Sequence, residues 1–185
     1  MFREIRTERL LLRRFRESDA PNYYAQLGSS REVTRHMLWQ PHTSPEESRG
    51  SIRKILARYD SGDCYCWAIT LPEEDLLIGR IDLLRIDREK GSCSFAYMLG
   101  ENQWNKGYGT EALRAVIGFA FEELGMDCVT ADHMTENPAS GKVMEKAGMV
   151  HTRTLPEKYE KNGRFFDAEE YTVTRDRWLR PTEKC

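Results

Sequence analysis

The sequence predicts an α/β fold of the α+β type: one mixed, mostly antiparallel sheet of about seven strands with flanking helices. Two observations predict it. Residues 64–100 contain three strand-like segments joined by short turns, and short turns join antiparallel neighbours. Residues 107–124 then form a long amphipathic helix between two strands, which makes those two strands parallel neighbours with a right-handed crossover.

The first third of the chain is predicted to hold one strand and three helical segments. The strand covers residues 8–15, a capped helix covers 18–27, and a second helical stretch reaches about Trp39. Ser44 is a typical N-cap followed by proline, so it predicts a third helix, which should end at residues 61–63.

The remaining elements follow from hydrophobic periodicity and from turn residues. Strands are predicted at 64–71, 76–87, 92–100 and 126–134, and helices at 107–124 and 138–147. The chain should close with a hairpin of residues 149–160 and 164–178, which turns at Asn162-Gly163.

The composition is that of a globular protein with one domain. The chain has 185 residues, 39% of them hydrophobic and 31% charged, with a formal net charge of −2. Nucleic-acid-binding proteins usually carry a strong basic patch, so nothing here calls for a nucleic-acid partner. No apolar run approaches the roughly 20 residues of a membrane helix, and the N-terminus lacks the apolar core of a signal peptide. We expect a single domain over residues 1–185, in the cytoplasm, with no membrane partner.

The five cysteines form no metal-binding pattern. No C-x-x-C pair occurs, and no histidine cluster stands near Cys64 and Cys66. We expect Cys64, Cys66, Cys93 and Cys128 to be reduced packing residues, Cys185 to lie in the tail, and no metal to bind.

The stretch NQWNKGYGTEAL, residues 102–113, contains the pattern G-x-G-x-x-A. The pattern is typical of dinucleotide sites, and Asp132 stands where such sites carry a ribose-binding acid. However, the preceding strand ends several polar residues before Gly107, and the strands before it pair by hairpins. These facts disfavour a dinucleotide site, and a P-loop is excluded because no G-K-[ST] follows.

Two interpretations of this loop remain. Glycines at the start of a long helix leave free backbone N–H groups where the helix dipole favours an anion, and Lys106 adds positive charge. Alternatively, the loop is a glycine turn without a ligand, since Glu111 in the first helical turn is also ordinary capping.

The segments FAYMLGENQWNKGYGTEAL and ENPASGKVMEKAGM together resemble the acetyl-coenzyme A-binding core of the GNAT N-acetyltransferase superfamily, and most of all its RimJ/RimL-type subgroup. The order and spacing of W-x-K-G-Y-G-T-E-A-L and N-x-x-S-x-x-V-M-E-K-A-G are similar to those of the family. The resemblance is dense over residues 76–150 and thinner toward both ends. It implies the GNAT fold, with a splayed central pair of parallel strands, and acetyl-CoA as co-substrate without a metal.

The resemblance assigns the glycine loop to the pyrophosphate of coenzyme A. Backbone N–H groups would bind it, from Asn105, Lys106, Gly107, Tyr108, Gly109 and Thr110. The family often has Gln or Arg where this chain has Trp104, which puts one side-chain contact in doubt. Met98 and Leu99, at the end of the preceding strand, would hold the pantetheine arm, and an N–H near Met98 would polarise the thioester carbonyl.

Two residues at the start of the 138–147 helix are expected to act on the cofactor. By resemblance, Asn137 orients its arm and Ser140 hydrogen-bonds the departing thiolate, although both residue types are also ordinary helix caps. Many relatives carry a tyrosine acid where this chain has Met144, which cannot donate a proton. Ser140, acting directly or through water, is therefore the candidate proton donor.

The base that takes the amine proton is left open. The candidates are Glu101 and Asp82, placed first, then Glu136, Asp132 and His133. Asp132 and His133 alternate along one strand, so only one of them can face the site. A bound water could serve instead, and each side chain could equally be a solvated or hydrogen-bonded strand residue.

The acceptor is expected to bind between residues 35–42, RHMLWQPH, and the last hairpin. The candidate substrate-binding residues are His36, Trp39, Tyr97 and Phe166, with Asp167 at the same opening. For Trp39 and Phe166, burial as packing residues is an equal alternative.

The predicted function is transfer of an acetyl group from acetyl-CoA to a primary amine, either a protein N-terminus or a small-molecule amine. The amine would attack directly in a ternary complex. The alternative is a non-catalytic CoA-binding sensor or interaction protein. The sequence does not name the acceptor, and a homodimer is one assembly open to the chain.

Overall fold

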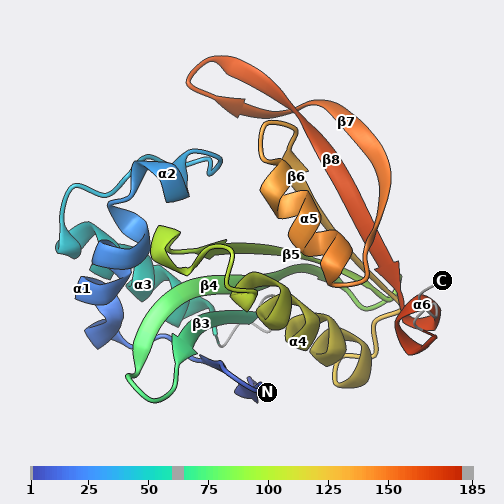
Figure 1. Ribbon diagram of the computed structural model, residues 1–185, viewed down its shortest axis with the longest axis horizontal. Helices are drawn as coiled ribbons and strands as arrows, with labels where there is room; N and C mark the ends of the chain where they lie inside the picture. Colours follow the sequence, from blue (N-terminus) through green and yellow to red (C-terminus); the bar gives the residue numbers. More distant parts are fainter. Residues whose placement is uncertain (1, 60–64, 181–185) are drawn as a thin grey trace.

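The computed structural model describes residues 2–59 and 65–180, which form one eight-stranded sheet with helices on both faces (Figure 1). The strand order is β1-β2-β3-β4-β5-β6-β8-β7. Every neighbouring pair is antiparallel except β5 and β6, which are parallel. The predicted mixed, mostly antiparallel sheet with a parallel central pair is confirmed.

The eighth strand comes from the N-terminus. The single strand expected at residues 8–15 is a hairpin of β1 (Ile5–Arg6) and β2 (Leu11–Arg13). Thr7 closes the turn, because its amide donates to the Leu10 carbonyl at 2.9 Å and its hydroxyl accepts from the Leu10 amide at 3.0 Å.

The helical region before the sheet is more broken than its sequence predicts. It consists of η1 (Glu17–Asp19), α1 (Ala20–Tyr23), the wide π turn η2 (Tyr24–Gly28), α2 (Arg31–Thr34) and α3 (Pro45–Arg58). The second helical stretch therefore stops at Thr34, well short of Trp39. The cap of α3 is confirmed, since the Ser44 hydroxyl accepts from the Glu47 amide. Its expected end at 61–63 lies outside the described residues.

The later elements match their predicted ranges within a few residues. They are β3 (Tyr65–Leu71), β4 (Leu76–Asp87), β5 (Ser92–Leu99), η3 (Glu101–Gln103), α4 (Tyr108–Glu122), β6 (Cys128–Met134), α5 (Pro138–Lys146), β7 (Val150–Lys161) and β8 (Arg164–Thr174). The last strand was expected to reach residue 178, but it gives way to α6 (Arg175–Leu179). The Thr174 hydroxyl caps that helix by accepting from the Arg177 amide.

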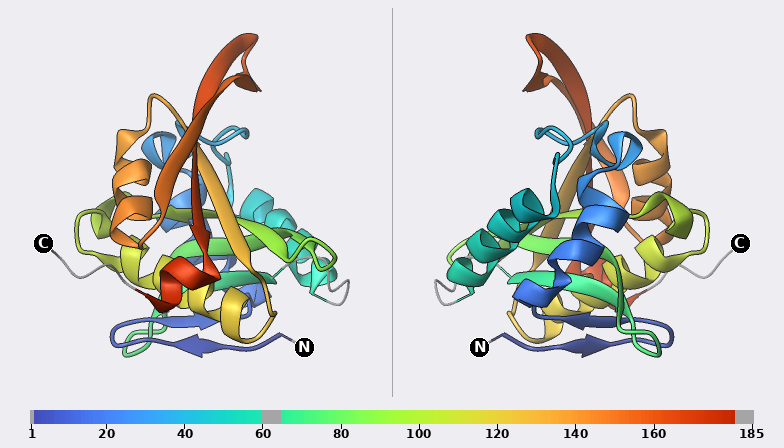
Figure 2. Two further views of the ribbon diagram at one scale, coloured as in Figure 1. Left: turned by 90° about the vertical axis from the view of Figure 1, so that its right-hand side faces the viewer. Right: turned by 90° about the vertical axis from the view of Figure 1, so that its left-hand side faces the viewer.

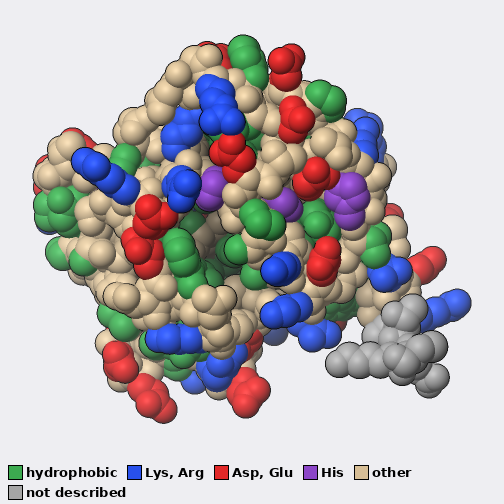
Figure 3. Space-filling model, turned by 45° about the horizontal axis from the view of Figure 1, so that its top comes forward, with side chains coloured by type: hydrophobic (Ala, Val, Ile, Leu, Met, Phe, Trp, Pro, Cys, Tyr) green, Lys and Arg blue, Asp and Glu red, His purple; other side chains and the backbone are tan. Residues whose placement is uncertain are grey.

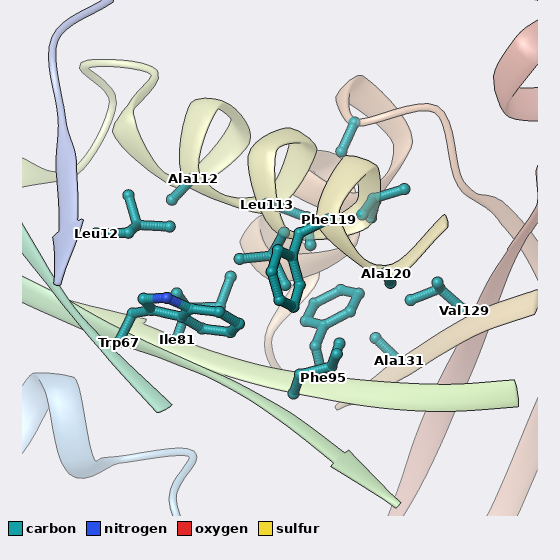
Figure 4. Close-up of a cluster of buried hydrophobic side chains, with 14 of the residues drawn as sticks. Leu12, Trp67, Ile81, Phe95, Ala112, Leu113, Phe119, Ala120, Val129 and Ala131 are labelled. Carbon is teal, nitrogen blue, oxygen red and sulfur yellow. The ribbon is translucent and has the colours of Figure 1, made fainter. Parts of the chain in front are cut away.

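The sheet separates two hydrophobic clusters. On one face α4 and α5 pack over residues that include Trp67 and Phe95 (Figure 4). On the other face α1 and α3 cover a smaller cluster that includes Tyr23 and Met98. Figure 2 shows α3 and α5 on opposite sides of the sheet. Because side chains alternate along a strand, neighbours such as Tyr97 and Met98 serve different faces.

Three cysteines agree with the packing role expected of them. Cys66 and Cys93 are buried, Cys128 is half-buried, and all three are free thiols. Burial raises the pKa of Cys93 to about 12, which keeps that thiol protonated and inert. Cys64 and Cys185 lie outside the described residues. Among the helices of the described chain, none is both long and apolar enough to cross a membrane.

Candidate active site

The central parallel strands separate soon after they meet. β5 and β6 pair only from Ser92 with Cys128 to Ser94 with Thr130. Beyond that point β6 rises beside β8, while β5 runs on toward α1 (Figure 1). The last residues of β5 keep β4 on one side and have no β6 partner on the other. An unpaired strand edge of this kind offers N–H and C=O groups to an extended ligand.

Leu99 is the residue whose backbone serves this open edge. The Gly100 amide donates to the Ile78 carbonyl at 2.9 Å, so Leu99 and Gly79 form a non-hydrogen-bonded pair of the β4–β5 ladder. The amide and carbonyl of Leu99 therefore point away from β4, toward the gap. By the same alternation the backbone groups of Met98 point toward β4, and its side chain is buried on the α1 and α3 face.

The glycine loop has the conformation that an anion site requires. Asn105 and Gly107 both have left-handed backbone angles, with φ of 60° and 84°. Gly107 is the N-cap of α4, and no side chain caps it. The first amides of α4 therefore point outward, where the helix dipole favours negative charge. An added Cβ on Gly109 would lie 3.3 Å from the Leu99 side chain, which shows how closely α4 begins against β5.

A salt bridge between Arg9, near the start of the chain, and Glu111 of α4 holds this loop in place. The backbone amide and Nε of Arg9 donate to the Glu111 carboxylate at 2.9 and 2.7 Å, and the Thr7 hydroxyl donates to it at 2.6 Å. Arg9 also donates to the Lys106 carbonyl at 2.9 Å and lies 4.7 Å from the centre of the Tyr108 ring. Arg9 is a functional candidate that the sequence did not reveal, because about a hundred residues separate it from the loop.

α5 presents Ser140 across the gap from β5. The hydroxyl of Tyr97 lies 3.2 Å from the Ser140 hydroxyl oxygen. Burial raises the pKa of Tyr97 to about 12, although the hydrogen bond with Ser140 opposes the shift. Asn137 occupies the N-cap position of α5, but its side chain makes no capping hydrogen bond. The Asn137 side chain therefore does not act as a helix cap, and no capping hydrogen bond competes for its side-chain amide group.

A cleft opens between the broken helices and the last hairpin. It has a volume of about 880 Å³. The residues that line it are Tyr24, Ser29, Arg31, Thr34, Arg35, Gln40, Pro41, His42, Thr43, Lys161, Asn162, Arg164 and Phe166. Figure 3 shows a hollow on this face of the molecule, with basic, histidine and acidic side chains around it. We call this the cationic cleft. The Lys161 ammonium ties its two walls together by donating to the carbonyls of Thr34 and Arg35, each at 2.9 Å.

Comparison with known proteins places the chain in a family. Residues 9–150 match the family described as "Acetyltransferase (GNAT) domain". This chain is a GNAT-family N-acetyltransferase. It is 31% identical over 161 residues to the uncharacterized N-acetyltransferase p20 of Bacillus licheniformis, covering 87% of this chain and 90% of p20.

Two further similarities are to ribosomal-protein N-acetyltransferases. The [ribosomal protein uS5]-alanine N-acetyltransferase of Escherichia coli is 26% identical over 153 residues, covering 77% of this chain and 75% of that protein. The solved structure of RimL, a ribosomal L7/L12 alpha-N-protein acetyltransferase in complex with coenzyme A, superposes with a TM-score of 0.83. That match covers 95% of this chain and 99% of RimL at 18% identity, so it shows the fold alone.

Acetyl-CoA is the co-substrate of the GNAT family, and the residues of this acetyltransferase fit it. The open edge of β5 suits the amide-bearing pantetheine arm, and the outward amides of α4 suit a pyrophosphate. The Trp104 indole Nε1 donates to the Leu99 carbonyl at 2.9 Å, so of the two Leu99 backbone groups it is the amide that is left for the cofactor. The described part of the chain contains no group of three or more His, Cys, Asp or Glu residues that could hold a metal.

The two first-ranked base candidates of the acetyltransferase lie in different surroundings. Glu101 is exposed in η3 and accepts a hydrogen bond from the Ser30 hydroxyl at the cap of α2. Asp82 is buried and forms a two-point ion pair with Arg80, at 2.8 and 3.0 Å. The Asp82 carboxylate is thus engaged by a cation. The Glu101 carboxylate instead contacts Ser30, which follows Ser29, a lining residue of the cationic cleft.

The other base candidates of the acetyltransferase are also engaged. The Asp132 carboxylate binds the Lys158 ammonium at 2.5 Å and the Tyr159 hydroxyl, while His133 turns to the opposite face, under α5. The Nε2 of His133 is buried without a hydrogen-bond partner in the described chain. Glu136 is exposed and pairs with Arg164 at 2.8 Å.

The four predicted substrate residues of the acetyltransferase are not gathered in one place. Phe166 lines the cationic cleft. Trp39 packs against His42, a cleft residue, with ring centroids 5.0 Å apart. His36 lies near Lys161 and Glu136, and burial together with the charge of Arg35 lowers its pKa. Tyr97 lies apart from these three, beside Ser140.

Proposed function

We propose that this acetyltransferase, as a single domain over residues 1–185, transfers an acetyl group directly from acetyl-CoA to a primary amine in a ternary complex. The observation that carries the proposal is the early separation of β5 and β6 beside an uncapped α4 N-terminus. Such a gap would let the cofactor and the amine approach each other directly, so that no acetyl-enzyme is needed. Acetyl-CoA supplies the thioester: the amine nitrogen bonds to the carbonyl carbon, and the carbon–sulfur bond breaks.

The cofactor would be held mainly by backbone groups. We assign the pyrophosphate to the amides of residues 105–110, with Lys106 adding positive charge nearby. We assign the pantetheine arm to the open edge of β5 at Leu99, and Asn137 to the orientation of the arm from the other side of the gap. A fixed amide at this edge would stabilise the negative charge that builds on the carbonyl oxygen in the transition state. Met98 would support this edge through its buried side chain.

Two protons move in the reaction. We assign the proton that reaches the thiolate to Ser140, which Tyr97 orients at 3.2 Å. We assign the proton that leaves the amine to Glu101, because its exposed carboxylate stands next to the cationic cleft. Asp82 is the second candidate, although its buried carboxylate is already bound by the Arg80 guanidinium. General bases of this kind typically contribute about 10²–10⁴-fold to the rate.

Thiol release tests this proposal. The protein is mixed with acetyl-CoA and a panel of amines: N-terminal peptides, amino acids, polyamines and aminoglycosides. Free thiol that depends on both the amine and the protein supports transfer. If CoA protects the protein against thermal unfolding but no amine raises thiol release, the non-catalytic alternative holds.

The assignment of the base has its own variant. Glu101→Gln keeps the shape of the side chain and removes its charge, so kcat should fall about 10²-fold at neutral pH. Glu89→Gln, in the exposed turn between β4 and β5, is the matched control and should leave kcat unchanged. If Asp82→Asn loses kcat while Glu101→Gln retains it, the two roles are reversed.

A further inference from the structure

We infer that the acceptor carries an anionic group beside its reacting amine, and that the cationic cleft binds this group. The inference rests on the proposed function and names the chemical class of its acceptor. The chemistry is that of an amine with a nearby carboxylate or phosphate, such as an N-terminal peptide with acidic residues in its first positions.

The lining of the cleft has one sign of charge. None of the lining residues is Asp or Glu. Four of them are Lys or Arg: Arg31, Arg35, Lys161 and Arg164. They come from two distant parts of the chain, around α2 and around the β7–β8 turn. The fold therefore concentrates positive charge here, although the whole chain has a net charge of −2. A concave site lined by one sign of charge focuses its potential on ligands of the opposite sign.

Two of the four cations are compensated by neighbouring carboxylates, and two are not. Arg164 pairs with Glu136 at 2.8 Å, and Arg35 pairs more loosely with Glu32 at 3.6 Å. Within residues 2–59 and 65–180, Lys161 donates to two neutral backbone carbonyls and pairs with no carboxylate, so its charge stays uncompensated there. Arg31 forms no ion pair or hydrogen bond with the residues the structure describes, and its exposed guanidinium is available to a ligand.

The positions of the charges also orient a ligand. Glu101 lies at one side of the cleft through its contact with Ser30, next to the lining residue Ser29. An acceptor whose amine lies near Glu101 would extend its other groups toward Arg31 and Lys161. The rings of Tyr24 and Phe166 add apolar walls. A polyamine fits this pattern poorly, because its second ammonium would face the cations.

A set of matched peptides tests the inference on the full chain. Three amidated tetrapeptides share one N-terminal residue, followed by acidic, neutral or basic residues, and spermidine is the polycation. A fourth peptide with phosphoserine in place of the acidic residue separates phosphate from carboxylate. The expected kcat/KM for the acidic or phosphorylated peptide is at least about tenfold above that of the basic peptide, and the ratio should shrink as salt is raised.

Charge removal in the cleft locates the effect. In the variant Arg31→Gln, which removes a cation without an ion-pair partner in the described chain, KM for the acidic peptide should rise about fivefold, while KM for acetyl-CoA and for the neutral peptide stays within about twofold. Arg53→Gln is the matched control: it removes a surface arginine of α3 that pairs with Glu17, away from the cleft. Thermal unfolding of both variants establishes that they are folded.

The outcomes separate the two proposals. Equal kcat/KM for the acidic, neutral and basic peptides overturns the inference and leaves the acetyltransferase function standing. If no amine raises thiol release, the proposed function fails. Fluorescence anisotropy of labelled peptides then tests whether the cationic cleft binds an anionic peptide. Tighter binding of the acidic than of the neutral peptide, lost in Arg31→Gln, then supports the inference, and equal binding overturns it.

Discussion

The hydroxyl of Tyr97 on β5 meets the hydroxyl of Ser140 on α5 at 3.2 Å, across the gap that opens between β5 and β6. Met144 occupies the position at which the family resemblance would place a tyrosine acid, and it is buried. The chain thus has a tyrosine near its candidate proton donor, but the tyrosine comes from the strand and not from the helix.

This contact predicts graded losses of activity. Ser140→Ala should lower kcat about 10²-fold by removing the proton donor to the thiolate, and Tyr97→Phe about tenfold by removing its partner. KM for acetyl-CoA should change little in either variant. Steady-state kinetics measure both values, and unchanged kcat in Ser140→Ala would contradict the assignment.

The same contact predicts a pH profile. Because burial raises the pKa of Tyr97 to about 12, its hydroxyl keeps its proton throughout the range in which enzymes are assayed. Ionisation of Tyr97 should therefore not lower kcat below about pH 10. Any alkaline decline of kcat below that pH should be the same in the wild-type protein and in Tyr97→Phe. A decline near pH 9 present only in the wild-type protein would argue that Tyr97 ionises.

The brace on the glycine loop predicts an effect on cofactor affinity. Arg9→Ala removes the bonds of that side chain to Glu111 and to the Lys106 carbonyl, so the loop amides should lose their fixed orientation. We expect KM for acetyl-CoA to rise about five- to tenfold with kcat largely kept. Arg6→Ala, a neighbouring exposed arginine on β1, is the control, and an equal effect in both variants would remove the brace from the account.

Glu111 predicts the direction of acid destabilisation. Burial would raise the pKa of Glu111, but hydrogen bonds from Thr7 and Arg9 lower it overall below its usual 4.5. A carboxylate with a lowered pKa contributes stability above its unfolded value, and that contribution is lost as the pH falls through the folded value. The free energy of unfolding of the wild-type protein should therefore drop more steeply below about pH 4.5 than that of Glu111→Gln. Denaturant titrations between pH 3 and 7 measure the difference.

The ion pair beneath β2 predicts a large loss of stability. Arg13 is 1% exposed and binds Asp19 through two bonds of 2.9 Å. Asp19→Asn would leave the guanidinium buried beside a neutral group, at a cost of about 3–5 kcal/mol. Asp75→Asn removes the exposed partner of the same arginine and should cost at most about 1 kcal/mol. Similar losses for the two variants in chemical denaturation would show that burial does not set the difference.

Gly141 predicts a steric link between α5 and the sheet. An added Cβ would lie 2.7 Å from the His133 Nε2 and 2.8 Å from the Tyr171 hydroxyl, so either these two rings or α5 must shift to accept alanine. Gly141→Ala should cost about 1–3 kcal/mol of stability and lower kcat, because Ser140 moves with the helix. Gly50→Ala in α3 meets nothing within 4 Å and should be neutral or stabilising by up to about 1 kcal/mol. Thermal unfolding and kinetics of both variants give the comparison.

The sequence by itself determined the elements whose pattern is local. The stripe of α4 and the alternation and turns of β3, β4 and β5 are written in neighbouring residues, because each element buries one face of its own. The glycine loop and Ser140 were found in the same way, by short motifs. The second helical stretch, expected to reach about Trp39, was predicted too long, since contacts such as the close approach of Gly28 to His42 and Ser48 override local propensity.

Only the tertiary structure decided how the site is assembled. The brace from Arg9 to Glu111, the contact of Tyr97 with Ser140 and the engagement of Asp82 by Arg80 depend on which strands become neighbours and which way each side chain points. The cationic cleft likewise joins residues near 31 to residues near 161, which no sequence window contains. Local patterns follow from the burial of one element's face, whereas a site arises where several elements meet, and that depends on the packing of the whole sheet.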